Sequence, residues 1–350
     1  MLITHVISEC TDIEKVYLIK SFAERMNREF DLEILLPEGI PAISILNGTR
    51  VKLTALPLGR DDENLIRNIY IIGRYLKRSG SGIVHSHGSV CGSIASFLAS
   101  RGDLVAIKDY YASYTLGRVL SALSPRARLS LTLSYSPSDR DIFRRAGVRP
   151  GSIINVPYGV DVNISPPKLK APQSSLPIIS AFCIDGEECS LFLSAVSALV
   201  RERRIIAYVE TPPDISPYVR HLACALGIGR SVVSFDVGTM PDECVTASFC
   251  FVLPSLRPSV IPLNAARFMS FGVPAIVPDT PRCLDLVKEG YTGATFRFGN
   301  SFSLSSAINR LLRNSQKREM LSRAARAKIE SSYSLDSSVC ALAALYTSLG

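Results

Sequence analysis

The feature that most constrains this chain is an alternation of short apolar runs with longer amphipathic segments, repeated from one end to the other. The apolar runs have the length of buried strands, and the segments between them have the apolar spacing of helices. Parallel strands need long crossover connections, and a helix is the usual one. The alternation therefore predicts an α/β fold with parallel sheets that helices cover on both faces.

The predicted elements form two sets, separated by a stretch rich in Pro, Ser and Lys. Strands are predicted at 3–7, 31–36, 51–56, 83–85, 104–107, 131–135 and 153–156, and then at 177–183, 204–209, 231–235, 248–253, 274–277 and 293–297. Helices are predicted at 12–29, 62–79, 90–100, 114–125 and 137–146, and then at 187–202, 214–226, 260–271, 281–289, 302–313 and 315–331.

These elements predict two doubly wound units in a chain of 350 residues. We predict an amino-terminal unit over 1–163, a linker over 164–175, a carboxyl-terminal unit over 176–333 and a closing helix over 334–350. Ligands of such folds bind beyond the carboxyl ends of the strands, so a cleft between the units is the expected site.

The composition excludes several classes of protein. Apolar residues make up 47% of the chain and charged residues 20%, which is typical of globular proteins and not of disordered ones. The net charge of +8 is spread over both halves, so no nucleic-acid partner is predicted. The favoured interpretation is that these basic residues lie on a solvated surface. Binding of an anionic ligand or of a membrane surface is the alternative.

The cysteines and the absence of targeting segments indicate a cytoplasmic protein. The nine Cys form no CxxC pair and no Cys/His spacing, which predicts reduced thiols and no metal site. Disulfides remain open if the source is a hyperthermophile. No leader peptide and no apolar stretch of spanning length is expected. Peripheral contact with the inner membrane face remains open.

Several different short motifs are spread along nearly the whole chain. They lie at 83–88, 135–138, 153–161, 252–255, 272–276, 285–293 and 332–334. In this order they resemble the motifs of retaining glycosyltransferases of family four. The resemblance implies a GT-B fold, in which two Rossmann-like units face each other across a cleft. It also implies metal-independent transfer of a sugar from a nucleotide-sugar donor to a lipid, glycan or small-molecule acceptor, with no further cofactor.

The amino-terminal half is most similar to the catalytic subunit that adds N-acetylglucosamine to phosphatidylinositol. The shared features are the segment from 56–58 to His85 and His87, and the Lys108-Asp109 position that follows. The resemblance implies acceptor-side roles for His85, His87 and Tyr110, the last of which stands where the family has a His. Transfer of a hexosyl or an N-acetylhexosaminyl group is expected.

The chemistry of such a transfer sets what the donor side needs. Negative charge develops on the departing diphosphate, so cations, helix amino-termini or backbone amides must surround it. Carboxylates must also fix the hydroxyls of the ribose and the sugar. The resemblance places the donor site at residues on two motifs and the turn before a helix: Ser255, Ser259, Val260, Ile261, Arg267 and Asp285. His87, Asp109 and Arg267 are the candidate catalytic residues.

The chain departs from the family pattern at the positions that matter most. Ser259 and Arg267 stand where the family has its paired Glu, and Pro262 has no N–H to offer a phosphate. The stretch 180–188 is acidic where the family has cations, and 8–12 lacks the family's Gly-rich turn. The donor scheme would then depend on backbone amides near 255–261, on Arg267, and on Asp285 or Ser259 for the hydroxyls.

Each candidate also has a purely structural interpretation. His85 and His87 lie on one face of their strand by alternation, as cleft residues or as hydrogen-bonded strand-end residues. His5 is interpreted as structural. Asp109 is either an acceptor-side carboxylate or a loop acid. Arg267 either binds a phosphate or is a partly exposed residue of a helix. Asp285 is expected to open a helix, where a carboxylate is favourable in any case, and Gly159 is expected to permit a tight turn.

Three hypotheses about function follow from these observations. The first is an active glycosyltransferase with an unusual donor pocket. The second is a catalytically impaired protein of the same fold, a pseudoenzyme that binds a ligand or serves as an assembly subunit. The third is an isomerase or another nucleotide-sugar enzyme on this scaffold, because a fold alone does not fix the chemistry.

Overall fold

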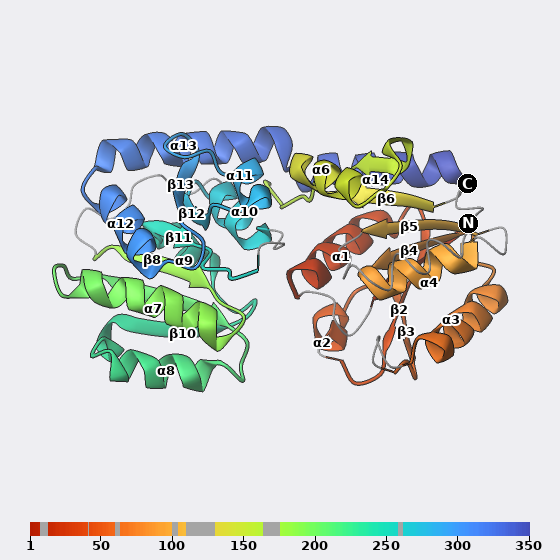
Figure 1. Cartoon of the computed structure of the whole chain (residues 1–350), viewed down its shortest axis with the longest axis horizontal. Coiled ribbons are helices and arrows are strands. Elements are labelled where there is room, and N and C mark those ends of the chain that lie inside the picture. Colours follow the sequence, from red (N-terminus) through yellow and green to blue (C-terminus); the bar gives the residue numbers. More distant parts are fainter. Residues whose placement is uncertain are drawn as a thin grey trace. The chain divides into compact units, whose positions relative to one another are not determined.

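The structure is a computed structural model that describes residues 1–7, 13–40, 42–59, 64–99, 104–109, 130–163, 176–257 and 262–350. The chain forms two compact units. Unit 1 comprises Met1–Gly159 together with Leu335–Gly350, and unit 2 comprises Val160–Ser334. Each unit contains one parallel sheet with helices around it (Figure 1). None of the described helices combines the length and the apolar character that crossing a bilayer requires.

Unit 1 is built on a seven-stranded parallel sheet with the order β3-β2-β1-β4-β5-β6-β7. Its strands are β1 (Leu2–Ile7), β2 (Asp31–Pro37), β3 (Lys52–Leu56), β4 (Ile83–His87), β5 (Val105–Asp109), β6 (Ser130–Ser134) and β7 (Ile153–Asn155). Its helices are α1 (Ile13–Met26), α2 (Ala42–Leu46), α3 (Leu65–Ser79), α4 (Ser89–Ala99), α6 (Pro137–Arg145), the 3-10 helix η2 (Pro150–Ser152) and α14 (Leu335–Leu349).

Unit 2 is built on a six-stranded parallel sheet with the order β10-β9-β8-β11-β12-β13. Its strands are β8 (Ile178–Phe182), β9 (Ile206–Thr211), β10 (Val232–Asp236), β11 (Cys250–Val252), β12 (Ala275–Pro278) and β13 (Gly293–Phe296). Its helices are α7 (Gly186–Val200), α8 (Ser216–Ala225), η3 (Gly229–Ser231), α9 (Asp242–Ala247), α10 (Leu263–Ser270), α11 (Pro281–Leu286), α12 (Ser301–Leu312) and α13 (Ser315–Ser332).

The strand order of both sheets is that of a doubly wound fold. The direction of winding reverses between β1 and β4 in unit 1 and between β8 and β11 in unit 2. Ligands of open parallel sheets bind beyond the carboxyl ends of the strands at such a reversal. The loops that follow these four strands are therefore where each unit is expected to hold its functional residues.

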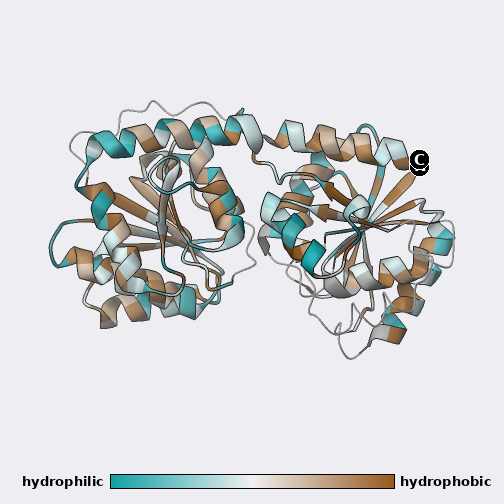
Figure 2. Ribbon diagram, turned by 45° about the horizontal axis from the view of Figure 1, so that its top comes forward, coloured by the Kyte–Doolittle hydropathy of each residue, from teal (hydrophilic) through white to brown (hydrophobic). Residues whose placement is uncertain are grey.

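Alternation along the strands of unit 1 separates two environments. Val6 on β1 and Val84 on β4 belong to an apolar cluster with α3 and α4. Their neighbours in the strands therefore face the opposite side of the sheet, where α1 contacts α14. His5 and His85 lie on that second side. In Figure 2 the strands are largely brown, whereas the helices carry both brown and teal residues, as expected of elements with one face toward a core.

The sequence predicts the elements well. Each predicted strand is confirmed, and β4 and β5 extend two residues beyond their predicted ends. The helix predicted at 114–125 lies outside the described residues, as does the predicted linker at 164–175. The short helices α2 and α9 were not predicted, because one or two turns are too short to show a helical period.

Gly159 is needed for a reason that differs from the predicted one. A Cβ at this position would lie 2.5 Å from Leu335 Cα and 2.9 Å from Leu335 N, both backbone atoms at the start of α14. Gly159 is also absent from the glycines of positive φ. The absence of a side chain thus permits close approach of two backbone segments, and the expected tight turn is not the cause.

We expect Gly159→Ala to lower the free energy of unfolding by about 2 kcal/mol, because the methyl group must displace the first turn of α14. Urea unfolding followed by circular dichroism measures this change. Gly151→Ala is the matched control, since a Cβ there meets nothing within 4 Å. Equal stability of the two variants would show that α14 shifts without cost.

Candidate functional site

Three histidines and one carboxylate gather where β1, β4 and β5 end. The strand register places His5 opposite His85 and His87 opposite Asp109. The rings of His85 and His87 lie on one face of β4, as the alternation predicts, with ring centroids 4.4 Å apart. All four side chains are buried. We call His5, His85, His87 and Asp109 the strand-end cluster of unit 1.

Asp109 organises one side of this cluster. It is the last residue of β5, so the interpretation as a loop acid is wrong. Its Oδ2 accepts from Tyr135 Oη at 2.8 Å and lies 2.7 Å from His87 Nδ1. Its Oδ1 accepts from Lys15 Nζ and from the Gly88 N–H, each at 3.2 Å. Burial alone would raise the pKa of Asp109, but Lys15 and His87 overcome this effect and hold that pKa below its usual range.

The other side of the cluster is closed by Tyr346 of α14. Its hydroxyl lies 2.6 Å from His85 Nδ1 and 3.3 Å from His5 Nε2. His5 Nδ1 lies 2.9 Å from His87 Nε2. Burial lowers the pKa of His5 to about 3, and burial and His87 lower the pKa of His85 well below its usual value. Both imidazoles are therefore neutral at physiological pH.

This geometry bears on the acceptor-side roles predicted for His85 and His87. Each ring is 1% exposed, and both nitrogens of His87 already contact another member of the cluster. Within unit 1 these side chains are thus positioned to orient one another and the loops beside them. Tyr110, the third acceptor-side candidate, lies outside the described residues.

In unit 2, backbone amides at the winding reversal are bonded to a carboxylate of the chain itself. Glu188, in the first turn of α7, is buried. Its Oε2 accepts from the Ile184 N–H at 3.0 Å, and its Oε1 accepts from the Leu256 N–H at 3.2 Å. Ile184 follows β8 and Leu256 follows β11, so both amides stand where a Rossmann-like unit binds phosphate. Burial raises the pKa of Glu188.

Ser255, a candidate donor residue from its motif, directly precedes Leu256 in the chain. It is fully buried, and its Oγ accepts from the Arg257 N–H at 3.1 Å. Arg257 Nε lies 3.7 Å from Glu188 Oε1. The other predicted donor residues of this turn, Ser259, Val260 and Ile261, lie outside the described residues.

Arg267 is held by acidic partners in unit 2. Its guanidinium lies 3.9 Å from Glu210 Oε2 and 3.2 Å from Asp242 Oδ1, and it donates to the Met240 carbonyl at 3.4 Å. Glu210 is buried near the end of β9. Burial raises the pKa of Glu210, although Arg267 and the Gly238 N–H oppose the rise. The described contacts of Arg267 thus compensate buried acid, which is a structural task.

The expectation that Asp285 opens a helix is wrong. Helix α11 ends at Leu286, so Asp285 lies in its last turn, where a carboxylate gains nothing from the helix dipole. The predicted extension of this helix to residue 289 fails because the chain turns into an extended conformation at Val287. The Asp285 carbonyl accepts from Tyr333 Oη at 3.4 Å.

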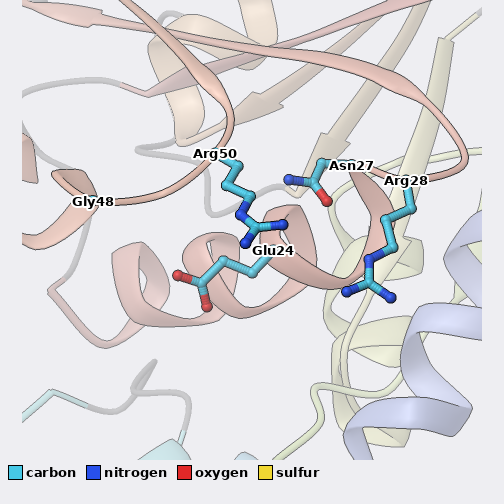
Figure 3. A pocket seen from close by; sticks show the side chains of 5 residues that line it. All are labelled: Glu24, Asn27, Arg28, Gly48 and Arg50. Carbon is cyan, nitrogen blue, oxygen red and sulfur yellow. The ribbon is translucent and has the colours of Figure 1, made fainter.

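Two hollows on the described surface lie away from these residues. One, of about 220 Å³, lies in unit 1 and is lined by Glu24, Asn27, Arg28, Gly48 and Arg50 (Figure 3). The other, of about 350 Å³, lies in unit 2 beside β13, α12 and α13, with Arg310 and Lys317 in its lining. Neither is lined by a residue that the sequence predicts for the donor or the acceptor.

Sequence reasoning missed several residues of both sites. Tyr346 and Tyr135 approach Asp109 and the histidines from distant parts of the chain, and His5 was interpreted apart from His85 and His87. Glu188 falls in the stretch noted as acidic, and that composition was the available signal. Its capping spacing after Asp185, whose Oδ1 accepts from the Glu188 N–H, was a second signal.

Comparisons with known proteins agree with this architecture. Residues 218–328, in unit 2, match the model of the family described as "Glycosyl transferases group 1". A search of curated proteins finds no match to the chain. A glycosyltransferase from Rickettsia africae shares 14% identity with a TM-score of 0.80, and the alignment covers 99% of this chain and 98% of that one.

Two further solved structures are similar over their whole length. HepE from Anabaena, in complex with UDP, has a TM-score of 0.80 at 13% identity, with 99% of this chain and 100% of that one covered. Sucrose-phosphate synthase from Thermosynechococcus elongatus has a TM-score of 0.79 at 14% identity, with 100% and 99% covered. These likenesses show a GT-B fold of two Rossmann-like units, and with the family match they support a glycosyltransferase.

Proposed function

We propose that this protein transfers a glycosyl group from a nucleotide-sugar donor to a lipid, glycan or small-molecule acceptor, with retention and without a metal ion at the diphosphate. The proposal rests on a combined observation: the chain has two doubly wound sheets, and unit 2 matches a glycosyltransferase family. HepE, of the same fold, has been solved with UDP and with UDP-glucose. A uridine diphosphate sugar is therefore the first donor to test.

The proposed donor site lies beyond the carboxyl ends of β8 and β11. Support comes from the amides of Ile184 and Leu256, from buried Ser255, and from the start of α7. A helix amino-terminus and backbone amides together bind phosphate without a metal, and here the two amides would have to exchange Glu188 for the phosphate. The strand-end cluster of unit 1 would support the acceptor side, with His87 and Asp109 as positioning residues.

A second candidate function rests on what occupies these groups. The Glu188 carboxylate accepts from both amides, and Arg267 is paired with Glu210 and Asp242. A diphosphate would have to displace or tolerate this negative charge, which favours a protein that binds its ligand weakly and transfers no sugar. A pseudoenzyme that serves as a binding or assembly subunit is the function this observation supports.

Titration with UDP, UDP-glucose and UDP-N-acetylglucosamine tests the two candidates. A ligand that binds the folded state stabilises it, by about 2.7 kcal/mol at a hundredfold excess over Kd. The melting temperature rises as a result. Release of UDP in the presence of acceptors then measures turnover. Binding with turnover supports the transferase, and binding without turnover supports the pseudoenzyme. No binding of any of these ligands would refute the donor site.

Arg267→Ala tests whether this side chain contributes to the donor site. If Arg267 contacts a phosphate, the affinity for UDP falls by about tenfold, the usual effect of losing one charge-assisted hydrogen bond. The exposed Arg201, just after α7, provides the control Arg201→Ala. A lower melting temperature with unchanged affinity for UDP would show that Arg267 only compensates Glu210 and Asp242.

A further inference from the structure

The hydrogen bonds of the strand-end cluster of unit 1 leave one buried ring nitrogen without a partner among the described residues. One ring nitrogen from each of His5, His85 and His87 can be chosen so that all three lie within 4.8 Å of one another. The three rings are held by β1 and β4, two adjacent central strands in fixed register. Three imidazoles that converge in this way are a common ligand set for divalent metal ions.

The other ring nitrogen of each histidine contacts an oxygen outside the three imidazoles. His87 Nδ1 contacts Asp109 at 2.7 Å, His85 Nδ1 contacts Tyr346 Oη at 2.6 Å, and His5 Nε2 contacts the same hydroxyl at 3.3 Å. Histidines that bind a metal usually have their second ring nitrogen bonded to a carboxylate or another oxygen, which fixes the ring. Here all three rings have such a partner.

The nitrogens that these oxygens do not contact are His87 Nε2, His5 Nδ1 and His85 Nε2, and we call them the inward nitrogens. The first two contact each other at 2.9 Å. His85 Nε2 is buried, and no group among the described residues forms a hydrogen bond with it. A buried polar atom without a partner destabilises the folded state, because it has lost its hydrogen bond to water. A metal ion is the ligand that would satisfy it.

The donors and acceptors can be followed through the cluster. If His87 Nδ1–H donates to Asp109, then His87 Nε2 is an acceptor and His5 Nδ1–H donates to it. His5 Nε2 then accepts from Tyr346 Oη–H, and the Tyr346 oxygen accepts from His85 Nδ1–H. Each contact is satisfied in this scheme, and a lone pair on His85 Nε2 is left over. Binding of an ion by His5 Nδ1 requires the other tautomer of His5, in which the proton lies on Nε2 and is donated to the Tyr346 oxygen.

We propose that His5, His85 and His87 bind one divalent metal ion of the zinc class through these inward nitrogens, with Asp109 and Tyr346 fixing the rings. Imidazole ligands suit Zn²⁺, Co²⁺ and Ni²⁺ and disfavour Mg²⁺ or Ca²⁺. The ion joins β1 to β4 and, through Tyr346, fixes α14 on unit 1. It is enclosed within unit 1 and has no part in neutralising the donor diphosphate.

Rules for metal-ligand spacing look for residues that are close together in the sequence, so they predict no metal site in this chain. Here His5 and His85 are brought together only by the parallel register of β1 and β4. The exposed fractions of the three side chains do not exceed 2%, so the ion must enter during folding or through a local opening. We therefore expect the metal to stay bound through purification.

Metal analysis of the full-length protein tests the proposal. The protein is produced in medium with added zinc and washed with a chelator, and its metal content is measured by mass spectrometry. About one Zn²⁺ per chain is expected, as at other three-histidine sites. Protein refolded with Co²⁺ should show the visible absorption of a low-coordinate cobalt site. His85→Ala should lose both signals, whereas His221→Ala, at an exposed histidine of α8, should keep them.

A second variant keeps the test decisive if His85→Ala does not fold. Tyr346→Phe leaves the three rings in place and removes the hydroxyl that orients two of them, so metal affinity should fall about 10- to 100-fold. Wild-type protein without zinc and without a cobalt spectrum would overturn the proposal, as would equal metal content in His85→Ala and His221→Ala. Unchanged affinity in Tyr346→Phe would also overturn it. None of these readouts depends on nucleotide binding or sugar transfer.

Discussion

Asp109→Asn is expected to lower the free energy of unfolding by about 3 kcal/mol or more, because the change removes one partner of a buried ion pair. The Lys15 ammonium lies 3.2 Å from Asp109 Oδ1, and its side chain is 11% exposed. Asn keeps one acceptor oxygen but loses the charge that compensates Lys15. It also cannot accept from Lys15, His87, Tyr135 and the Gly88 N–H together. Urea unfolding measures the difference.

Asp141→Asn is the matched control for this prediction. Asp141 is an exposed carboxylate of α6 in the same unit, and its loss should change the stability by less than about 0.5 kcal/mol. The double variant Asp109→Asn with Lys15→Met should be less destabilised than the sum of the single changes, since the unpaired charge is removed. Additive effects would show that Lys15 does not depend on Asp109, and the ion pair would then have no role in stability.

The sequence was a good guide to the fold because each element of a doubly wound unit is specified locally. The buried strands are short apolar runs, and helices such as α6 begin with a hydroxyl residue and a Pro, here Ser136 and Pro137. Where a helix spans fewer than two turns, as in α2 and α9, the apolar spacing does not repeat and gives no signal. The end of α11 was misjudged because Val287, which is extended, continues the apolar spacing of the helix.

The sites were less predictable because contacts between distant residues form them. The alternation along β4 brings His85 and His87 to one face, and this was visible in the sequence. That His5 lies opposite His85 depends on which strands are neighbours, and that Tyr346 completes the group depends on where the last helix packs. Neither follows from a period. Motif matching selected Arg267 and Ser255 as candidates but could not show that Arg267 has acidic partners.

Glu188→Gln is expected to raise the affinity for UDP by about 5- to 30-fold, or about 1 to 2 kcal/mol, through loss of a negative charge beside the proposed diphosphate site. The amide oxygen can still accept from one of the two N–H groups, of Ile184 or Leu256, and the amide NH₂ leaves the other free for a phosphate oxygen. Because the folded state raises the pKa of Glu188, this carboxylate costs stability as the pH rises above its ordinary value. The variant should therefore also lose less stability than wild type between pH 4.5 and neutrality.

Glu187→Gln separates this effect from a general change in charge. Glu187 is the exposed neighbour of Glu188 in the first turn of α7, so its replacement removes the same charge from the same helix end. Isothermal titration with UDP should show tighter binding for Glu188→Gln and a change of less than about twofold for Glu187→Gln, because solvent screens an exposed charge. Equal affinities in both variants would show that the Glu188 carboxylate lies away from the ligand. Weaker binding in Glu188→Gln would show instead that this carboxylate holds a ribose hydroxyl, and the protein would then have replaced a missing family carboxylate with one from α7.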